Sequence, residues 1–199
     1  MQVYILKESN SDSRVAASPD TVKKMIDWGL KVAIQDNAGL NSNFSNEDYV
    51  KSGATISNSI TDISKTDLIL KINKPNDDEI ALMNEGSILI ASLDPYNNNE
   101  TLNKLKDKGV TSFAMELMPR ITRAQSMDIL SSQSNLAGYK AVIDATYLFN
   151  KAMPMMMTAA GTIAPAKVMV FGAGVAGLQA IATAKRLGAI VSATDVRMA

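Results

Sequence analysis

The sequence predicts an α/β protein built from two parallel-sheet units, the second truncated after a strand, a helix and a strand. Two observations predict this fold. Between residue 3 and about residue 116, short apolar runs alternate with helical patterns, as in a parallel sheet with crossover helices. Residues 167–195 then read as strand, glycine turn, helix and second strand. We place the first unit at residues 1–119, a connecting helix and loop at 120–165, and the beginning of the second unit at 166–199.

Helix caps and apolar runs define the elements of the first unit. Ser18 is a good N-cap with Pro19 at the first helical position. Ser45 can cap a short helix that Gly53 closes, and Pro75 opens a further helix. The predicted helices are 19 to about 30, 45–50, 75–83 and 100–108, and the predicted strands are 3–6, 32–34, 67–72, 87–91 and 110–114. This alternation is typical of a Rossmann-like or flavodoxin-like unit, here without a glycine fingerprint.

The connecting segment is unusually polar. Residues 121 to about 150 are predicted as a helix, with Gly138 as the place where it would break. Four residues recur every three or four positions and share one helical face: Asp128, Ser131, Asn135 and Gly138. Uncharged amides and hydroxyls on such a face suit hydrogen bonding to a flat polar ligand. The alternative is a solvated face on which an arginine and an aspartate form an ordinary surface pair.

A loop around Pro154 and the methionines at 155–157 is predicted to follow this helix. Methionine runs usually fill irregular gaps in a core. We therefore expect these three side chains to pack rather than to have a special role.

The glycine turn of the second unit has the pattern of a dinucleotide site. Gly172 permits a tight turn out of the strand, Gly174 leaves room for a pyrophosphate, and Gly177 lets the helix pack close to the sheet. The phosphates would lie at the positive end of the helix that begins near Val175. The alternative, an ordinary strand-to-helix turn, is disfavoured because the strand, helix and following acid are all in place.

The acid is Asp195, at the end of the second strand. A carboxylate there can accept hydrogen bonds from the adenosine ribose hydroxyls, and it favours NAD over NADP because a 2′-phosphate would face a like charge. Arg197 favours NADP instead, since its guanidinium could bind a 2′-phosphate.

Composition excludes several classes of function. The 20 basic and 20 acidic residues cancel, so no surface for nucleic acid or an anionic membrane is expected. The absence of cysteine and histidine excludes disulfides, thiolate metal sites, a cysteine nucleophile and a histidine base, and we predict no metal site. No apolar run approaches the roughly 20 residues that span a bilayer. The chain opens directly on a strand, which predicts a cytoplasmic protein.

Several motifs together carry a family resemblance. They are residues 120–133, 154–161, 172–188 and 195–197, joined by Lys7, Glu8 and residues 14–19 near the start. In these motifs the whole chain resembles the NAD(H)-binding domain of proton-translocating NAD(P) transhydrogenases, which is carried by the alpha subunit in bacteria. In layout it also resembles alanine dehydrogenase.

The transhydrogenase resemblance implies that NAD(H) binds here and exchanges hydride directly, with Re/Si specificity, with NADP(H) held on a partner domain. It implies NADP-binding and membrane proton-channel partners, a homodimer without nucleic acid, and a cytoplasmic location peripheral to the bacterial inner membrane.

A dinucleotide domain has about six strands, of which the second unit here holds two. We therefore expect this chain to be inactive alone, and to self-associate or be unstable.

The resemblance also assigns roles to individual residues. It places Arg120, Ile121 and Thr122 at the nicotinamide end, in a cleft between the two units. Gln125 would reach toward the partner's nucleotide, and Asp128 and Ser131 would hold the carboxamide. Catalytic roles are implied for Arg120, Gln125, Asp128 and Ser131. The implied cofactor-binding residues are Arg120, Ile121, Thr122, Gln125, Asp128, Ser131, Gly172, Gly174, Val175, Ala176, Gly177, Asp195, Val196 and Arg197.

Two other functions remain open at this point. Alanine dehydrogenases use a histidine and a lysine at their substrate, because reductive amination needs a group that titrates near neutrality. This chain has no histidine, and Lys71 and Lys74, at the lysine position, are more simply interpreted as solvated strand-end residues. Hydride exchange between two nicotinamides needs no such base. A non-catalytic NAD-binding module is the other alternative.

Overall fold

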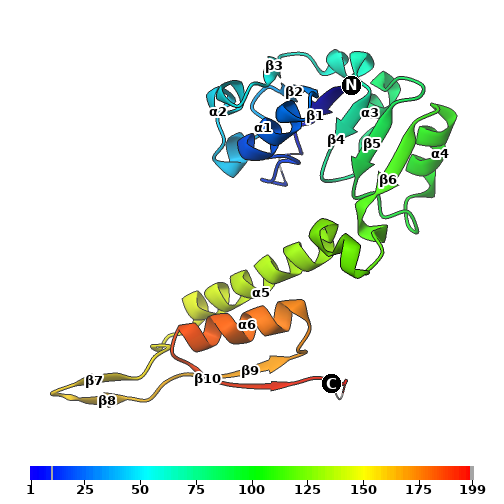
Figure 1. Ribbon diagram of the computed structural model, residues 1–199. Helices are drawn as coiled ribbons and strands as arrows, with labels where there is room; N and C mark the ends of the chain where they lie inside the picture. Colours follow the sequence, from blue (N-terminus) through cyan, green and yellow to red (C-terminus); the bar gives the residue numbers. More distant parts are fainter. Residues whose placement is uncertain (10, 198–199) are drawn as a thin grey trace. The chain divides into compact units, whose positions relative to one another are not determined.

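The computed structural model describes residues 1–9 and 11–197 of the chain. The chain forms two compact units, unit 1 at Met1–Pro119 and unit 2 at Arg120–Ala199 (Figure 1). Unit 1 contains a six-stranded sheet, and unit 2 contains a two-stranded parallel sheet and a separate antiparallel hairpin.

The sheet of unit 1 is parallel throughout, in the order β3-β2-β1-β4-β5-β6. This is the strand order of a Rossmann fold. The predicted α/β class is confirmed, and all the strands predicted for this unit are present. The strands are β1 (Gln2–Ile5), β2 (Lys31–Gln35), β3 (Thr55–Ser57), β4 (Leu68–Leu70), β5 (Ile88–Ala91) and β6 (Thr111–Ala114).

The edge strand β3 is an addition to the sequence prediction. Its three residues pair in parallel with β2. Without β3, the other strands of the sheet would have the flavodoxin-like order. A run of three residues is too short to show a strand periodicity. The choice between the two predicted folds is therefore made by tertiary pairing at the edge of the sheet.

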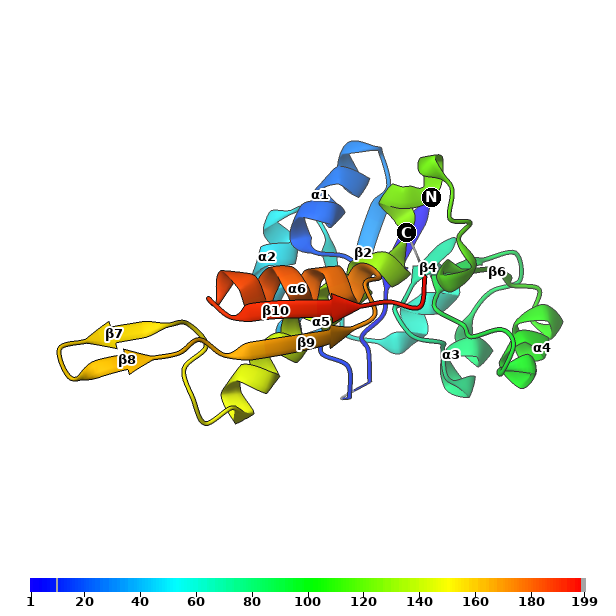
Figure 2. The same cartoon turned by 90° about the horizontal axis from the view of Figure 1, so that it is seen from below.

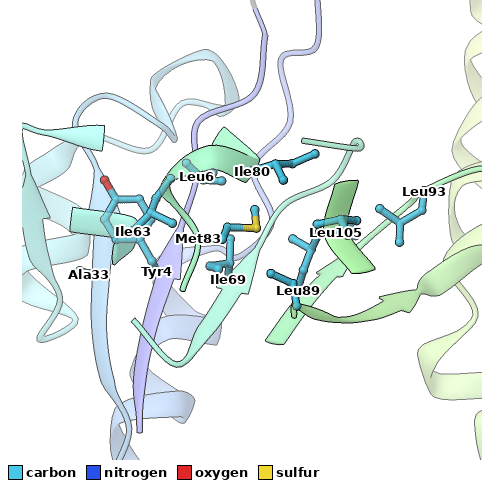
Figure 3. Packing of buried hydrophobic residues seen from close by; sticks show 12 residues of the cluster. Tyr4, Leu6, Ala33, Ile63, Ile69, Ile80, Met83, Leu89, Leu93 and Leu105 are labelled. Atoms are coloured by element: carbon cyan, nitrogen blue, oxygen red, sulfur yellow. The ribbon is translucent and has the colours of Figure 1, made fainter. Parts of the chain in front are cut away.

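Both faces of the unit 1 sheet are buried, because alternate residues of each strand point to opposite faces. Val3 and Ile5 belong to the core on one face, which also contains Val22 of α1 (Pro19–Asp27). Tyr4 and Leu6 belong to the core on the other face, together with residues of α3 (Asp77–Leu82) and α4 (Asn99–Asp107) (Figure 3). The central strand β1 is therefore inaccessible to water from either side.

The helices of unit 1 cover these two faces, and their caps explain where they begin. The predicted caps of Ser18 and Ser45 are confirmed: each side chain accepts a hydrogen bond from a backbone N–H in the first turn. The third helix begins at Asp77 rather than at Pro75, because Asn76 and Glu79 form a capping box there. The helices are α1 (Pro19–Asp27), α2 (Asn46–Lys51), α3 (Asp77–Leu82) and α4 (Asn99–Asp107), with 3₁₀ turns η1 (Leu40–Ser42), η2 (Ile60–Lys65) and η3 (Met115–Leu117).

Unit 2 contains the predicted strand, glycine turn, helix and strand. β9 (Lys167–Phe171) and β10 (Ile190–Thr194) pair in parallel, and Phe171 lies opposite Thr194 in the register. Among the described residues, no helix is long and apolar enough to cross a membrane, and this includes α5 (Ile129–Leu148). The elements are η4 (Thr122–Met127), α5 (Ile129–Leu148), β7 (Met156–Thr158), β8 (Gly161–Ile163), β9 (Lys167–Phe171), α6 (Val175–Arg186) and β10 (Ile190–Thr194).

The predicted helix from residue 121 is broken at a different residue. It consists of the 3₁₀ turn η4 and the α-helix α5, which meet at Asp128. Asp128 has an extended backbone conformation and its carboxylate caps α5, so the break is an N-cap. Helix α5 continues through Gly138, which is buried against α6. Glycine occurs there for close packing, and the prediction of a break at Gly138 is wrong.

The methionines at 155–157 lie at the β7–β8 hairpin rather than in a core: Met156 and Met157 belong to β7, and Met155 directly precedes it. Met155, Met156 and Met157 are 57%, 49% and 71% exposed. The hairpin extends away from the β9–β10 pair, as the yellow strands in Figures 1 and 2 show. The expectation that these methionines pack in a core is therefore wrong. Their run has neither alternation nor a charge, so the sequence pattern does not distinguish a strand from a packed loop.

A buried ion pair joins the end of β4 to α3. The Lys71 ammonium lies 2.7 Å from the Glu79 carboxylate, and their side chains are only 7% and 6% exposed. Glu79 also accepts a hydrogen bond from the Asn76 backbone N–H at 2.8 Å. Lys74 is exposed and donates to Asn98. The interpretation of Lys71 as a solvated lysine is wrong, because its partner approaches from a helix that begins several residues later.

We predict that Glu79→Gln lowers the free energy of unfolding by about 3 kcal/mol, because it leaves the Lys71 charge buried without a counter-ion. Urea unfolding followed by circular dichroism measures this. In the double variant with Lys71→Met most of the loss should be recovered. Glu100→Gln is the control, since its pair with Lys104 is exposed and should not affect stability measurably. Equal stability of Glu79→Gln and the unmodified chain would contradict the prediction.

Candidate dinucleotide site

The glycine turn joins the end of β9 to the start of α6. Gly172 has a φ of +95°, a conformation that side-chain-bearing residues rarely adopt. A Cβ on Gly177 would lie 1.8 Å from the Gly172 carbonyl oxygen, so only glycine lets α6 begin this close to the strand. These two glycines have the backbone roles that the sequence predicts for them.

The N-terminus of α6 is open. Its N-cap is Gly174, and within the described residues no side chain caps the first turn. A Cβ on Gly174 would meet only Arg197 of the described chain, at 3.9 Å. The first N–H groups of a helix have no partner within the helix, and they carry the positive end of its dipole. An anion such as a pyrophosphate fits this position. The backbone N–H groups of Ala176 and Gly177 would be its donors.

Asp195 lies against the glycine turn. Its carboxylate accepts hydrogen bonds from the backbone N–H of Ala173 at 2.6 Å and from that of Arg197 at 2.8 Å. The side chain of Asp195 is 16% exposed, and the Arg197 guanidinium lies 3.4 Å away. These two hydrogen bonds to the ionised form hold the pKa of Asp195 at about 2, and the one from the Arg197 N–H has the larger effect. The acid is therefore ionised at neutral pH and fixed beside the turn.

The remaining residues of this end of the sheet are exposed. The Arg197 side chain is 72% exposed, and Val196 is fully exposed. Thr194, the last residue of β10, accepts a hydrogen bond from the Gly172 N–H at 2.7 Å. The structure thus brings together the residues that the sequence predicts around a pyrophosphate and a ribose. Sequence reasoning missed the Ala173 N–H, whose role depends on where the second strand ends.

A second polar group lies at the start of α5. Asp128 accepts from the Ser131 backbone N–H at 2.9 Å and from its hydroxyl at 2.7 Å. The Ser131 hydroxyl is the main cause that lowers the pKa of Asp128, followed by the Ser131 N–H. Asp128 therefore stays ionised as the cap of the helix. Asp128 thus lies directly before α5, and not within the helical face on which it was predicted.

The other two residues of that predicted face are directed at α6. The Asn135 amide donates to the Gln179 side chain at 3.2 Å, and Gly138 packs against the backbone of Ala176. The face is thus divided between a polar helix start and a helix contact. Before it, Arg120, Ile121, Thr122 and Gln125 are all exposed. In the described part of the chain, no group of three acidic, histidine or cysteine side chains is placed to hold a metal ion.

Comparisons with known proteins show the family of the chain. The family model "Alanine dehydrogenase/PNT, N-terminal domain" matches residues 4–137, and the model "Alanine dehydrogenase/PNT, C-terminal domain" matches residues 141–199. The chain belongs to the alanine dehydrogenase/PNT family. Both halves of the chain are thus accounted for by one family, which contains the two enzyme classes that the sequence motifs resemble.

Within this family the chain is more similar to transhydrogenases. It is 51% identical to an NAD(P) transhydrogenase subunit alpha protein of Rhodospirillum rubrum, over all of this chain and 54% of the relative. The transhydrogenase structure from Sinorhizobium meliloti has a TM-score of 0.96 and 54% identity, covering 100% of this chain and 60% of that one. An L-alanine dehydrogenase structure has a TM-score of 0.88 and 27% identity, covering 99% and 55%. The chain spans about half the length of the curated relatives it matches.

We predict that the carboxyl group of Asp195 titrates at about pH 2 in the folded chain, against about 3.9 for an unfolded aspartate. A depressed pKa stabilises the fold above about pH 4, and this contribution is lost as the pH falls toward about 2. Carboxyl ¹³C NMR measures the midpoint, and the chain in denaturant is the control. Arg197→Ala should raise the midpoint only partly, because both backbone donors remain. A folded midpoint near that of an unfolded aspartate would contradict the assigned hydrogen bonds.

Proposed function

We propose that this chain binds NAD(H) through unit 2 and is the NAD(H)-binding part of an NAD(P) transhydrogenase. In this proposal, hydride passes directly between NAD(H) held here and NADP(H) held on a partner domain. The observation that carries the proposal is the Asp195 carboxylate fixed against the glycine turn, beside a helix start that no described side chain caps. The greater similarity to transhydrogenases than to alanine dehydrogenases supports the choice of reaction.

The residues of the turn fit a dinucleotide. The open N–H groups of α6 would receive the pyrophosphate, where no described side chain competes as a cap. Asp195 would accept hydrogen bonds from the ribose hydroxyls. Its negative charge, fixed by two backbone donors, would repel a 2′-phosphate. The nearby Arg197 guanidinium is already paired with Asp195 at 3.4 Å, which weakens the argument that it recruits such a phosphate.

The start of α5 would hold the nicotinamide end. A carboxamide needs an acceptor and a donor. The Asp128 carboxylate would be the acceptor, and the Ser131 hydroxyl, which donates to Asp128 at 2.7 Å in this structure, would turn to the carboxamide as the donor. Gln125 would reach toward the partner's nucleotide. Arg120, Ile121 and Thr122 would adjoin the ring, with Arg120 supplying a positive charge.

A reduced nicotinamide supplies the hydride when it is bound, and an oxidised nicotinamide accepts it. No proton is added to or removed from the reacting carbons, so the protein's task is to orient the rings and exclude water. Near neutral pH, Asp128 and Asp195 are ionised, and Gln125 and Ser131 are uncharged. A chain without histidine can carry out this chemistry.

The two acids of unit 2 are held in a way that suits this task. Asp195 accepts from two backbone N–H groups, and Asp128 accepts from the N–H and hydroxyl of one serine. In both cases hydrogen bonds to the ionised form lower the pKa. Neither acid is therefore poised to exchange a proton near neutrality. This favours a reaction in which the protein orients its ligands over one that needs acid–base catalysis.

Amino-acid oxidation fits the structure less well. The Lys71 ammonium is buried and engaged by the Glu79 carboxylate at 2.7 Å, so it is not available to a substrate carboxylate. The chain also has no histidine to transfer a proton. We therefore keep the alanine dehydrogenase activity and the non-catalytic module as outcomes of the tests below.

The proposal extends to the assembly. The Rhodospirillum rubrum relative is named as an alpha subunit, which indicates an enzyme of several components. We propose NADP-binding and membrane proton-channel components as partners, a homodimer, proton translocation coupled to Re/Si-specific hydride transfer, and a position on the cytoplasmic side of the bacterial inner membrane.

We predict that Asp195→Asn weakens NADH binding about tenfold, because a neutral amide accepts weaker hydrogen bonds than a carboxylate. The same variant should narrow the preference for NADH over NADPH, since the repulsive charge is removed. Fluorescence titration with both nucleotides measures this. The control is Asp144→Asn, a surface carboxylate of the same unit that pairs with Lys140. If Asp195→Asn bound NADH as tightly as the control, the ribose assignment would be wrong.

We predict that Asp128→Asn in the intact enzyme slows hydride transfer by about tenfold or more while NADH affinity changes less than about threefold, because the carboxamide would be misoriented rather than unbound. Stopped-flow transfer with the NADP-binding partner, alongside NADH titration, separates the two effects. Asp144→Asn is again the control. Unchanged transfer would refute the role of Asp128. NADH oxidation with pyruvate and ammonia would instead indicate alanine dehydrogenase, and NADH binding without exchange would indicate a binding module.

A further inference from the structure

A close approach of two helices in unit 2 involves Gly138, in the middle of α5. A Cβ placed on Gly138 would lie 2.1 Å from the carbonyl oxygen of Ala176, 2.8 Å from its carbonyl carbon and 3.0 Å from its Cα. All three are backbone atoms, so no side-chain rotation could relieve the overlap. Any larger residue at position 138 must therefore move α5 relative to α6.

The contact lies next to the glycine turn. Ala176 is the second residue of α6, so the contact fixes where α5 lies relative to the glycine turn. One turn earlier in α5, the Asn135 amide meets Gln179, one turn further along α6. The two contacts together hold the middle of α5 against the first turns of α6.

The other end of this arrangement is the start of α5. Asp128 and Ser131 both precede Gly138 in the sequence. Measured along a rigid helix axis, Asp128 lies about 15 Å from Gly138. A ligand that reaches both the glycine turn and the Asp128–Ser131 pair must match the spacing that the Gly138 contact sets. A ligand that reaches only the turn and Asp195 need not.

We propose that Gly138 is a positioning residue that sets this spacing and so selects a full dinucleotide over a mononucleotide. The inference rests on the proposed function of unit 2. Glycine is a poor residue for the middle of a helix. Gly138→Ala would favour α5 as a helix, so a loss of binding would come from the displaced contact and not from a weakened helix.

The test compares two ligands, NADH and AMP, by calorimetric titration of the chain. In Gly138→Ala, NADH affinity is expected to fall about tenfold or more, while AMP affinity stays within about twofold. Ala137→Ser adds an atom at the neighbouring exposed position and should change neither. Unchanged NADH affinity, or an equal loss for both ligands, overturns the proposal, the second because it indicates general damage to unit 2.

A second measurement uses the unmodified chain and does not depend on the variant's folding. Amide hydrogen exchange should show that NADH protects residues 129–138 as well as the start of α6, and that AMP protects only the latter. Absence of NADH protection in residues 129–138 overturns the role of Gly138. Failure of the unmodified chain to bind NADH at all is a distinct result, which refutes the proposed function and this inference with it.

Discussion

The hydrogen bond from the Ala173 N–H to the Asp195 carboxylate is the interaction on which the candidate site depends. It joins the turn after β9 to the residue after β10. The parallel pairing of these strands makes it feasible, because Phe171 and Thr194 lie opposite each other and both strands end at the same edge. In an antiparallel pair the two ends would lie at opposite edges of the sheet. Strand direction thus places a fixed negative charge beside a helix start that no side chain of the described residues caps.

The sequence predicts the features that depend on nearby residues. Helix caps at Ser18 and Ser45, the parallel strands and the glycine turn all follow from patterns within a few positions, and the structure confirms them. The features it misses are set by distant parts of the chain. Strand β3 exists because β2 offers an edge. The burial of Lys71 needs a glutamate from the following helix.

Gly138 is the clearest case of a residue whose local interpretation misleads. Within one helix a glycine indicates weakness, and a break there is the natural expectation. The carbonyl of Ala176, far along the chain, reverses that interpretation because it occupies the space that a side chain would fill. The residues of the candidate site were found from motif and resemblance. The spacing between these residues could not be predicted from the sequence, because it depends on how α5 and α6 cross.

Unit 1 has the strand order of a dinucleotide-binding fold, yet its own polar groups fill the position where such folds bind a ligand. That position lies where the order reverses, beyond the ends of β1 and β4. There the buried Glu8 carboxylate accepts from the backbone N–H of Ile72 at 2.7 Å and from the Asn73 amide at 3.0 Å. An anionic ligand would have to displace a carboxylate of the chain and would face its charge. In unit 2, the first N–H groups of α6 have no side-chain cap among the described residues. Unit 1 thus closes this position with its own carboxylate, whereas the start of α6 stays open among the described residues, and this difference favours the proposed assignment of NAD(H) to unit 2.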